Sequence, residues 1–124
     1  MVSYNEYLKK ILSQILDSYH ILREIQDKPG DLQRINKEML KTNGFIKVVV
    51  NNIDEKKIPQ SDFKPLQIKL GNYLEGYFFV KEIETMAPLY SDDMHRVKNM
   101  RLKIIEALED KKMIESVEDL IEKL

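Results

Sequence analysis

The stretch that decides the fold is residues 32–59, LQRINKEMLKTNGFIKVVVNNIDEKKIP. It opens with three apolar residues at helical spacing, which predict a short helix with one apolar face: Leu32, Ile35 and Met39. The letters KTNG that follow indicate a turn, in which Thr42 is available as an N-cap. The apolar rhythm resumes over residues 46–53 and predicts a second short helix.

Two short helices joined by a tight turn are typical of the helix-turn-helix, whose second helix enters the DNA major groove. Residues 60–65 then form a polar stretch with a proline, and residues 66–70, LQIKL, alternate strictly between apolar and polar. Strict alternation predicts a strand with one buried face. Paired with an extended segment beginning at Ile58, this strand would complete a β-hairpin, the wing. The expected fold class is therefore mostly α with a small β-hairpin (α+β).

Long apolar faces lie on both sides of this unit. Residues 4–25 predict a leading helix that the letters DKPG terminate, and residues 72–86 are apolar around much of a second helix that Pro88 would end. The letters SDD at residues 91–93 and SVED at residues 116–119 indicate two further helix starts. These faces are wider than one small domain needs, so we expect additional N- and C-terminal dimerisation helices and a homodimer.

Length and composition bound the molecule to one domain, residues 1–124. Within it we expect a winged helix-turn-helix core at residues 21–75 and a C-terminal helical dimerisation region at residues 76–124. A hydrophobic fraction of 43% with 33% charged residues is typical of a globular protein. The chain has no cysteine, and it has no apolar run near the roughly 20 residues that cross a bilayer. A cytoplasmic protein without membrane contact is the expectation.

Two passages carry a resemblance to a known family. They are residues 21–58, ILREIQDKPGDLQRINKEMLKTNGFIKVVVNNIDEKKI, and residues 68–77, IKLGNYLEGY. Their order resembles the winged helix-turn-helix of bacterial and archaeal transcription regulators, PadR-like or MarR-like. The letters IDEKKI at residues 53–58 are similar to that family's exit from the recognition helix into the wing. The resemblance implies a sequence-specific, DNA-binding transcriptional regulator that acts as a homodimer on double-stranded DNA.

Under this interpretation the recognition helix runs from about Asn43 to Lys56. Asparagine can pair with adenine, lysine with guanine, and valine can touch a thymine methyl group. Residues at the helix start and in the wing would instead hold phosphates. Residues 31–69 carry eight Lys and Arg against five Asp and Glu, a local surplus that suits a polyanion. The predicted DNA-binding residues are Lys41, Thr42, Asn43, Gly44, Lys47, Val48, Asn51, Lys56, Lys57 and Lys64.

No enzyme class is indicated. Histidine occurs only at His20, with Glu24 four residues on, and at His95, just after Asp92 and Asp93. A histidine among acids near a helix end is typical of a surface residue. Glycine-rich phosphate loops and nucleophile elbows are absent from the sequence. We therefore predict no catalytic residue, no metal and no cofactor, and the sequence does not identify a small-molecule effector.

One alternative stays open, a continuous helix from residue 31 to about residue 54 in an all-α bundle. Seven residues step by three and four across the expected turn without losing phase: Leu32, Ile35, Met39, Thr42, Ile46, Val49 and Ile53. Against it stand Gly44, since glycine costs about 1 kcal/mol inside a helix, and three consecutive valines. This alternative would be a protein–protein interaction module or complex subunit without DNA binding. Whether residues 63–70 are extended or helical separates the two interpretations.

Overall fold

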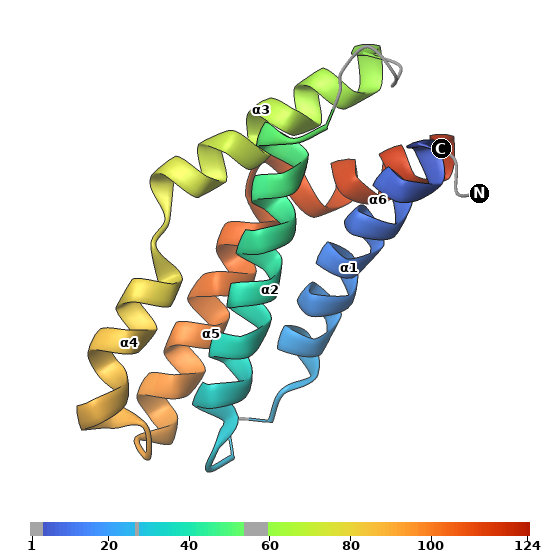
Figure 1. The fold of residues 1–124 in the computed structure, drawn as a ribbon. Helices are drawn as coiled ribbons and strands as arrows, with labels where there is room; N and C mark the ends of the chain where they lie inside the picture. The colour runs from blue at the N-terminus through green and yellow to red at the C-terminus, as the bar shows by residue number, and fades with distance from the viewer. Residues whose placement is uncertain (1–3, 27, 54–59) are drawn as a thin grey trace.

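The computed structural model describes residues 4–26, 28–53 and 60–124. These parts of the chain contain six α-helices and one short 3-10 helix, and no strand (Figure 1). In order they are α1 (Tyr4–Glu24), α2 (Asp31–Asn51), α3 (Gln60–Gly76), α4 (Phe79–Tyr90), α5 (Met94–Glu109), η2 (Asp110–Lys112) and α6 (Met113–Lys123).

The turn expected near residues 41–44 does not exist, because α2 continues through Gly44 as one helix. The physical reason lies in the apolar face that stays in phase. Ile46 and Val49 are fully buried, as Ile35 and Met39 are on the other side of the glycine. Burying an isoleucine or valine side chain is worth about 1.5–3 kcal/mol. One glycine costs about 1 kcal/mol in a helix interior, so burial decides the conformation.

The wing strand expected at residues 66–70 is also wrong, since this segment lies inside α3. Its alternation covers only five residues, whereas a helical period runs through the longer segment. Phe63, Leu66, Leu70 and Tyr73 are all buried at spacings of three and four residues. Ile68, which a strand would bury, is 54% exposed. The start of the expected hairpin, at residues 58–59, lies outside the described residues.

These two findings correct the expected fold class. The described residues form an all-α structure in place of the mostly α fold with a small β-hairpin (α+β), and the winged helix-turn-helix is not present among them. The alternative arrangement, a continuous helix in an all-α bundle, is the one that α2 and α3 adopt.

Other expected boundaries moved as well. One helix was expected over residues 72–86, but the chain breaks at Tyr77 and Phe78 and resumes as α4, which runs past Pro88 to Tyr90. The start expected at residues 91–93 is confirmed, because the Asp93 carboxylate caps α5 by accepting a 3.2 Å hydrogen bond from the Arg96 amide. α6 begins at Met113, three residues before the expected start.

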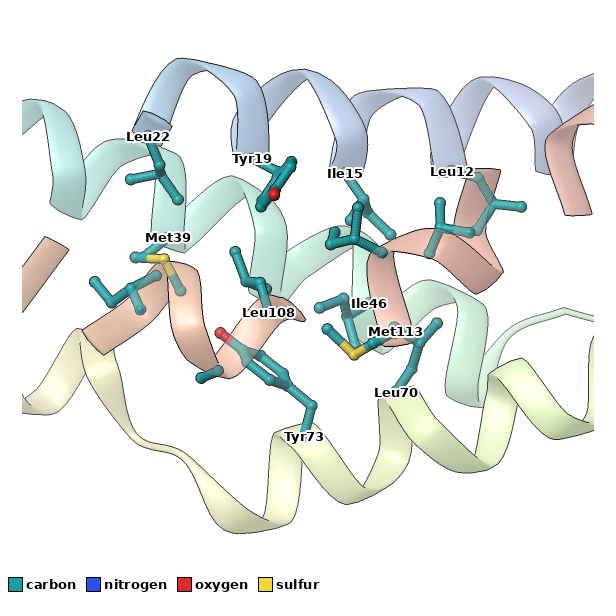
Figure 2. Packing of buried hydrophobic residues seen from close by; sticks show 14 of the residues in the cluster. Leu12, Ile15, Tyr19, Leu22, Met39, Ile46, Leu70, Tyr73, Leu108 and Met113 are labelled. Carbon is teal, nitrogen blue, oxygen red and sulfur yellow. The ribbon is translucent and has the colours of Figure 1, made fainter. Parts of the chain in front are cut away.

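The helices surround one hydrophobic core. In Figure 1, α2 lies between α1 and α4–α5, α3 crosses one end of the bundle, and α6 runs toward the start of α1. The buried apolar side chains form a single cluster to which every α-helix contributes. Figure 2 shows side chains of five helices pointing toward one another: Leu12, Ile15, Tyr19 and Leu22 of α1, Met39 and Ile46 of α2, Leu70 and Tyr73 of α3, Leu108 of α5 and Met113 of α6.

Polar side chains fix how neighbouring helices meet. Gln67 of α3 donates through Nε2 to the backbone oxygens of Val49 and Val50, at 3.4 and 3.1 Å. These carbonyls belong to the last turn of α2, where no intrahelical donor remains for them. On the other side of α2, the buried Ser18 hydroxyl donates to the Glu38 carboxylate at 3.1 Å. Because buried polar groups need partners, these bonds restrict how the helices can pack.

Candidate protein-binding surface

The two most exposed of the large apolar side chains lie at the two ends of α4. Leu89 is 75% exposed and Phe78, which caps α4, is 61% exposed. Between them runs a groove of about 410 Å³. It is lined by Phe78, Lys81, Glu82, Thr85, Met86, Leu89 and Tyr90.

A second hollow of about 350 Å³ adjoins this groove and extends it onto α5. The two share Met86 and Tyr90, and the second adds Arg96, Asn99, Met100 and Lys103. We call the residues that line both hollows the α4–α5 surface. Scattered exposed leucines are ordinary on proteins, but a continuous apolar patch rimmed by polar groups marks an interaction site.

The sequence explains why α4 has two apolar faces. α4 is a short helix whose inner face buries Phe79 and Ile83 against the core. Phe78, Thr85 and Leu89 are spaced by seven and four residues, which places them on another side of the helix, about 120° from Phe79 and Ile83 at 3.6 residues per turn. A helix of this length needs only one apolar face to be held to the bundle, so the outer one is available to another molecule.

Charged groups at the rim are held in place by ion pairs and ring contacts. Lys103 Nζ lies 3.2 Å from Glu82 Oε1, which links α5 to α4 across the surface. Arg96 lies with its guanidinium carbon 4.0 Å from the centre of the Tyr90 ring, and its Nε is 3.3 Å from Asp93 Oδ2. Exposed ion pairs contribute little stability. Their effect here is to keep both signs of charge beside an apolar groove.

The residues predicted to contact DNA differ in where they lie and in how exposed they are. Thr42 is fully buried. Asn43 and Val48 are half-buried, and Val48 packs against the core. Lys64 is exposed but belongs to α3, where its Nζ lies 3.5 Å from Gln67 Oε1. The predicted contacts at Lys56 and Lys57 lie outside the described residues.

The remaining four predicted residues do come together. Lys41, Gly44, Lys47 and Asn51 are exposed and share one face of α2, because they are spaced by three, three and four residues. The exposed charged side chains of α2 are all cationic, whereas its two acids are buried. The four cations are Arg34, Lys37, Lys41 and Lys47, of which Arg34 and Lys41 lie 3.4 and 3.3 Å from the buried carboxylates of Asp31 and Glu38. We call these four cations the α2 basic stripe.

Sequence reasoning did not single out Leu89. Pro88 was expected to end the helix before it, which removed Leu89 from the helical phase that begins at Phe78. The available signal was the repeat of apolar and small residues at 78, 85, 86 and 89 read through the proline. Proline near a helix end loses only one backbone hydrogen bond, so α4 can continue for two more residues.

Comparison with known proteins found no relative of this chain. No family model matches it, and neither the curated proteins nor the solved structures include a significant match. These comparisons therefore add nothing to the resemblance carried by residues 21–58 and 68–77. Within the described ranges, no helix is both long and apolar enough to cross a membrane.

Proposed function

We propose that the chain is an all-helical protein–protein interaction module that self-associates through the α4–α5 surface. The observation that carries the proposal is the pair of exposed apolar side chains at the two ends of one groove, Phe78 and Leu89. Leaving such side chains in water is unfavourable by about 25 cal/mol for each Å² of apolar area that a partner could cover.

A second copy is the partner that the groove fits. In an antiparallel pairing of two copies of α4 about a two-fold axis between Ile83 and Glu84, Phe78 of each copy meets Leu89 of the other. A two-fold axis makes every contact twice, so a surface that complements itself in this way closes as a dimer.

The charged residues of the groove are also compatible with a two-fold axis. Lys81 and Glu82 both line it, near its middle and with opposite sign. In the antiparallel arrangement Lys81 of one copy lies about four helical positions, roughly 6 Å along the axis, from Glu82 of the other. Long side chains span that distance, so Lys81 of each copy can join the Glu82–Lys103 ion pair of the other copy. A partner chain that was only acidic or only basic would face a like charge in this groove.

Measurement of molar mass by light scattering across a concentration series tests the proposal. Wild-type protein is expected to be dimeric, and Leu89→Glu or Phe78→Glu to be monomeric, because each places two charges in the apolar part of the interface. Leu40→Glu is the matched control, since Leu40 is 54% exposed on α2, away from the groove. A wild-type protein that stays monomeric up to about 200 µM would refute self-association.

A charge exchange separates a second copy from any other partner. Lys81→Glu alone is expected to weaken the dimer, because the introduced carboxylate of each copy then faces Glu82 of the other copy across the axis. The triple variant Lys81→Glu, Glu82→Lys and Lys103→Glu should restore it, since all three charges change sign in both copies and the ion pair between positions 82 and 103 is kept. Failure of the triple variant to recover the dimer would show that residues 81 and 82 do not face each other across a two-fold axis.

A second candidate function is favoured by the α2 basic stripe. Four exposed cations spread along a helix about 30 Å long give α2 a local positive charge that attracts the phosphates of nucleic acid. We propose double-stranded DNA as the partner of this stripe, bound through its backbone. With no turn before residue 44, base reading by a separate recognition helix has no structural support, and specific recognition stays a prediction from the sequence.

Gel-shift titration against random duplex DNA at 50 and 200 mM salt tests this second function. Backbone binding through three or four phosphates would give a slope of log affinity against log salt of about −3. Lys37→Ala with Lys47→Ala should reduce the affinity and flatten that slope. The paired control is Lys9→Ala with Lys10→Ala, two exposed lysines of α1. Equal losses of DNA affinity in the two double variants would show a general effect of charge and would contradict binding through the α2 basic stripe.

A further inference from the structure

A cavity of about 310 Å³ lies away from both surfaces, between the end of α3 and the connection from α5 to α6. Its polar lining comes from two places far apart in the sequence. Lys69 and Asn72 belong to α3, and Asp110 and Lys111 belong to η2. A concave space of this size with a few convergent polar groups is the usual form of a small-molecule site.

The cavity lining carries more positive than negative charge. Lys69 is oriented by α6, because its Nζ donates a 2.8 Å hydrogen bond to Ser116 Oγ. An ammonium group has three N–H donors, so this bond orients the group without exhausting it. Lys111 supplies a second ammonium and Asp110 the single carboxylate of the lining. The balance favours an anionic ligand over a cationic or neutral one.

Aromatic rings form another part of the lining. Tyr77 lies at the break between α3 and α4 and is half-buried. Its ring is stacked on Phe79, with centroids 5.2 Å apart and planes 14° from parallel. Tyr73 lies beside it, with ring centroids 5.5 Å apart, and is buried. A stacked pair is a rigid, flat surface, and a planar ligand group can pack on such a surface without further ordering.

The backbone of η2 is unusual at the same place. Lys111 and Lys112 have φ values of 53° and 59°, in the left-handed region that glycine normally occupies. Strained residues of this kind cluster at binding and catalytic sites. In this turn one of the two carries an ammonium on the cavity lining, which a glycine could not supply.

We propose that this cavity binds a small aromatic anion, with Lys69 and Lys111 holding its carboxylate or phosphate and the Tyr77 ring packing on its planar part. Asn72 offers an amide donor to the same anionic group. Asp110 opposes the binding of negative charge and favours ligands that also carry a hydrogen-bond donor. The site is independent of the α4–α5 surface and of the α2 basic stripe.

Phenyl phosphate is a suitable probe. It is titrated into the full chain at pH 7.5, and its binding is monitored by two-dimensional ¹H–¹⁵N NMR. The backbone signals of Asn72, Gly76 and Lys111 are expected to shift together with one dissociation constant. Phenyl phosphate should bind at least fivefold more tightly than inorganic phosphate, which lacks the ring, and than phenol, which lacks the charge. Absence of these shifts at 10 mM phenyl phosphate would overturn the proposal.

Two glycine variants form a matched pair that separates binding from folding. Lys111→Gly and Lys112→Gly relieve the same left-handed strain in adjacent residues, so both should fold at least as well as wild type. Only Lys111 lines the cavity. Lys111→Gly should weaken phenyl phosphate binding at least fivefold, and Lys112→Gly less than twofold. Equal affinities in the two variants would remove Lys111 from the site and overturn the proposal.

Two more variants are expected to act in opposite directions. Asp110→Asn removes the one opposing carboxylate, so it should tighten phenyl phosphate binding two- to fivefold. Tyr77→Leu removes the flat ring, so it should weaken phenyl phosphate at least threefold and leave inorganic phosphate unchanged. Weaker binding in Asp110→Asn, or equal effects of Tyr77→Leu on both phosphates, would contradict the assigned roles. Leu89→Glu should bind the probe as wild type does, whatever its oligomeric state.

Discussion

The guanidinium of Arg101, on α5, donates a 3.2 Å hydrogen bond to the backbone carbonyl of Leu22, in the last turn of α1. That carbonyl has no donor within its own helix, because the last four carbonyls of an α-helix lie beyond its hydrogen-bond ladder. Arg101 is buried and lies 79 residues away in the sequence. One cation thus completes the end of a helix and joins the first half of the chain to the second.

Replacement of Arg101 by methionine should therefore destabilise the fold. Methionine keeps an unbranched apolar stem, so the variant loses mainly the charged donor and leaves the Leu22 carbonyl unpaired. The free energy of unfolding in urea should fall by about 2 kcal/mol, as expected for a hydrogen bond to a charged group. Arg34→Met, at an exposed arginine on α2, should change it little. Equal effects at the two positions would contradict the structural role of Arg101.

Gly44→Ala tests the continuity of α2 directly. Gly44 lies inside the helix without a positive φ, and a Cβ built there meets no atom within 4 Å. Alanine in a helix interior is better than glycine by about 1 kcal/mol, so the midpoint of thermal unfolding should rise. A turn at this glycine would give no such gain. A lower midpoint in Gly44→Ala would therefore argue for a bent backbone.

Thr42→Val should also stabilise the protein. The Thr42 side chain is fully buried, and its hydroxyl has no hydrogen-bond partner among the described residues. Valine has nearly the same shape and removes the unpaired group, for an expected gain of about 1 kcal/mol in the free energy of unfolding. Thr85→Val is the comparison, because the Thr85 hydroxyl donates to the Lys81 carbonyl at 2.9 Å. No gain at Thr42 would indicate that its hydroxyl finds a partner in solution.

Tyr73→Phe should change how stability depends on alkaline pH. Burial of Tyr73, reinforced by the nearby Tyr77, raises the pKa of its phenol well above the usual range. In the unfolded chain a tyrosine ionises near pH 10, so above that pH the unfolded state releases a proton that the folded state keeps. The stability is therefore fully present below about pH 10 and is lost as the pH rises further.

In the Tyr73→Phe variant the free energy of unfolding should fall less steeply above pH 10, by up to about 1.4 kcal/mol less for each pH unit. Some decline should remain, because burial and the hydrogen bond to Glu109 also raise the pKa of Tyr19. The measurement is urea unfolding from pH 7 to pH 11. Between pH 7 and pH 9 the two proteins should keep a constant difference. Identical slopes above pH 10 would mean that Tyr73 is accessible to water in the folded state.

Several elements could be predicted because their cause is local. The leading helix was expected over residues 4–25 and is α1, since one wide apolar face and the letters DKPG determine where it runs and stops. The start of α5 was expected at residues 91–93 from a capping Ser91 hydroxyl and two acids near the helix start; the start is confirmed, but the capping group is the Asp93 carboxylate. Of the candidate surfaces, the exposed face with Lys41, Gly44, Lys47 and Asn51 could be anticipated from helical spacing alone.

Other features depended on partners that local patterns do not contain. The letters LQIKL fit a strand as well as a helix, and only burial of Phe63, Leu66 and Leu70 against the core selects the helix. The α4–α5 surface could not be recognised in advance, because its exposure depends on which face of α4 the rest of the bundle covers. The small-ligand cavity joins residues about 40 positions apart, Lys69 and Lys111.

The sequence by itself determined which residues repeat at helical spacing and where the proline–glycine pair ends a helix. It also determined that the acids and bases are unevenly distributed along the chain. Only the tertiary structure decided that Gly44 lies within one helix and that residues 66–70 are helical. The reason is energetic. A single glycine or a five-residue alternation changes the free energy by about 1 kcal/mol, whereas the core formed by distant helices contributes more than that through each buried side chain.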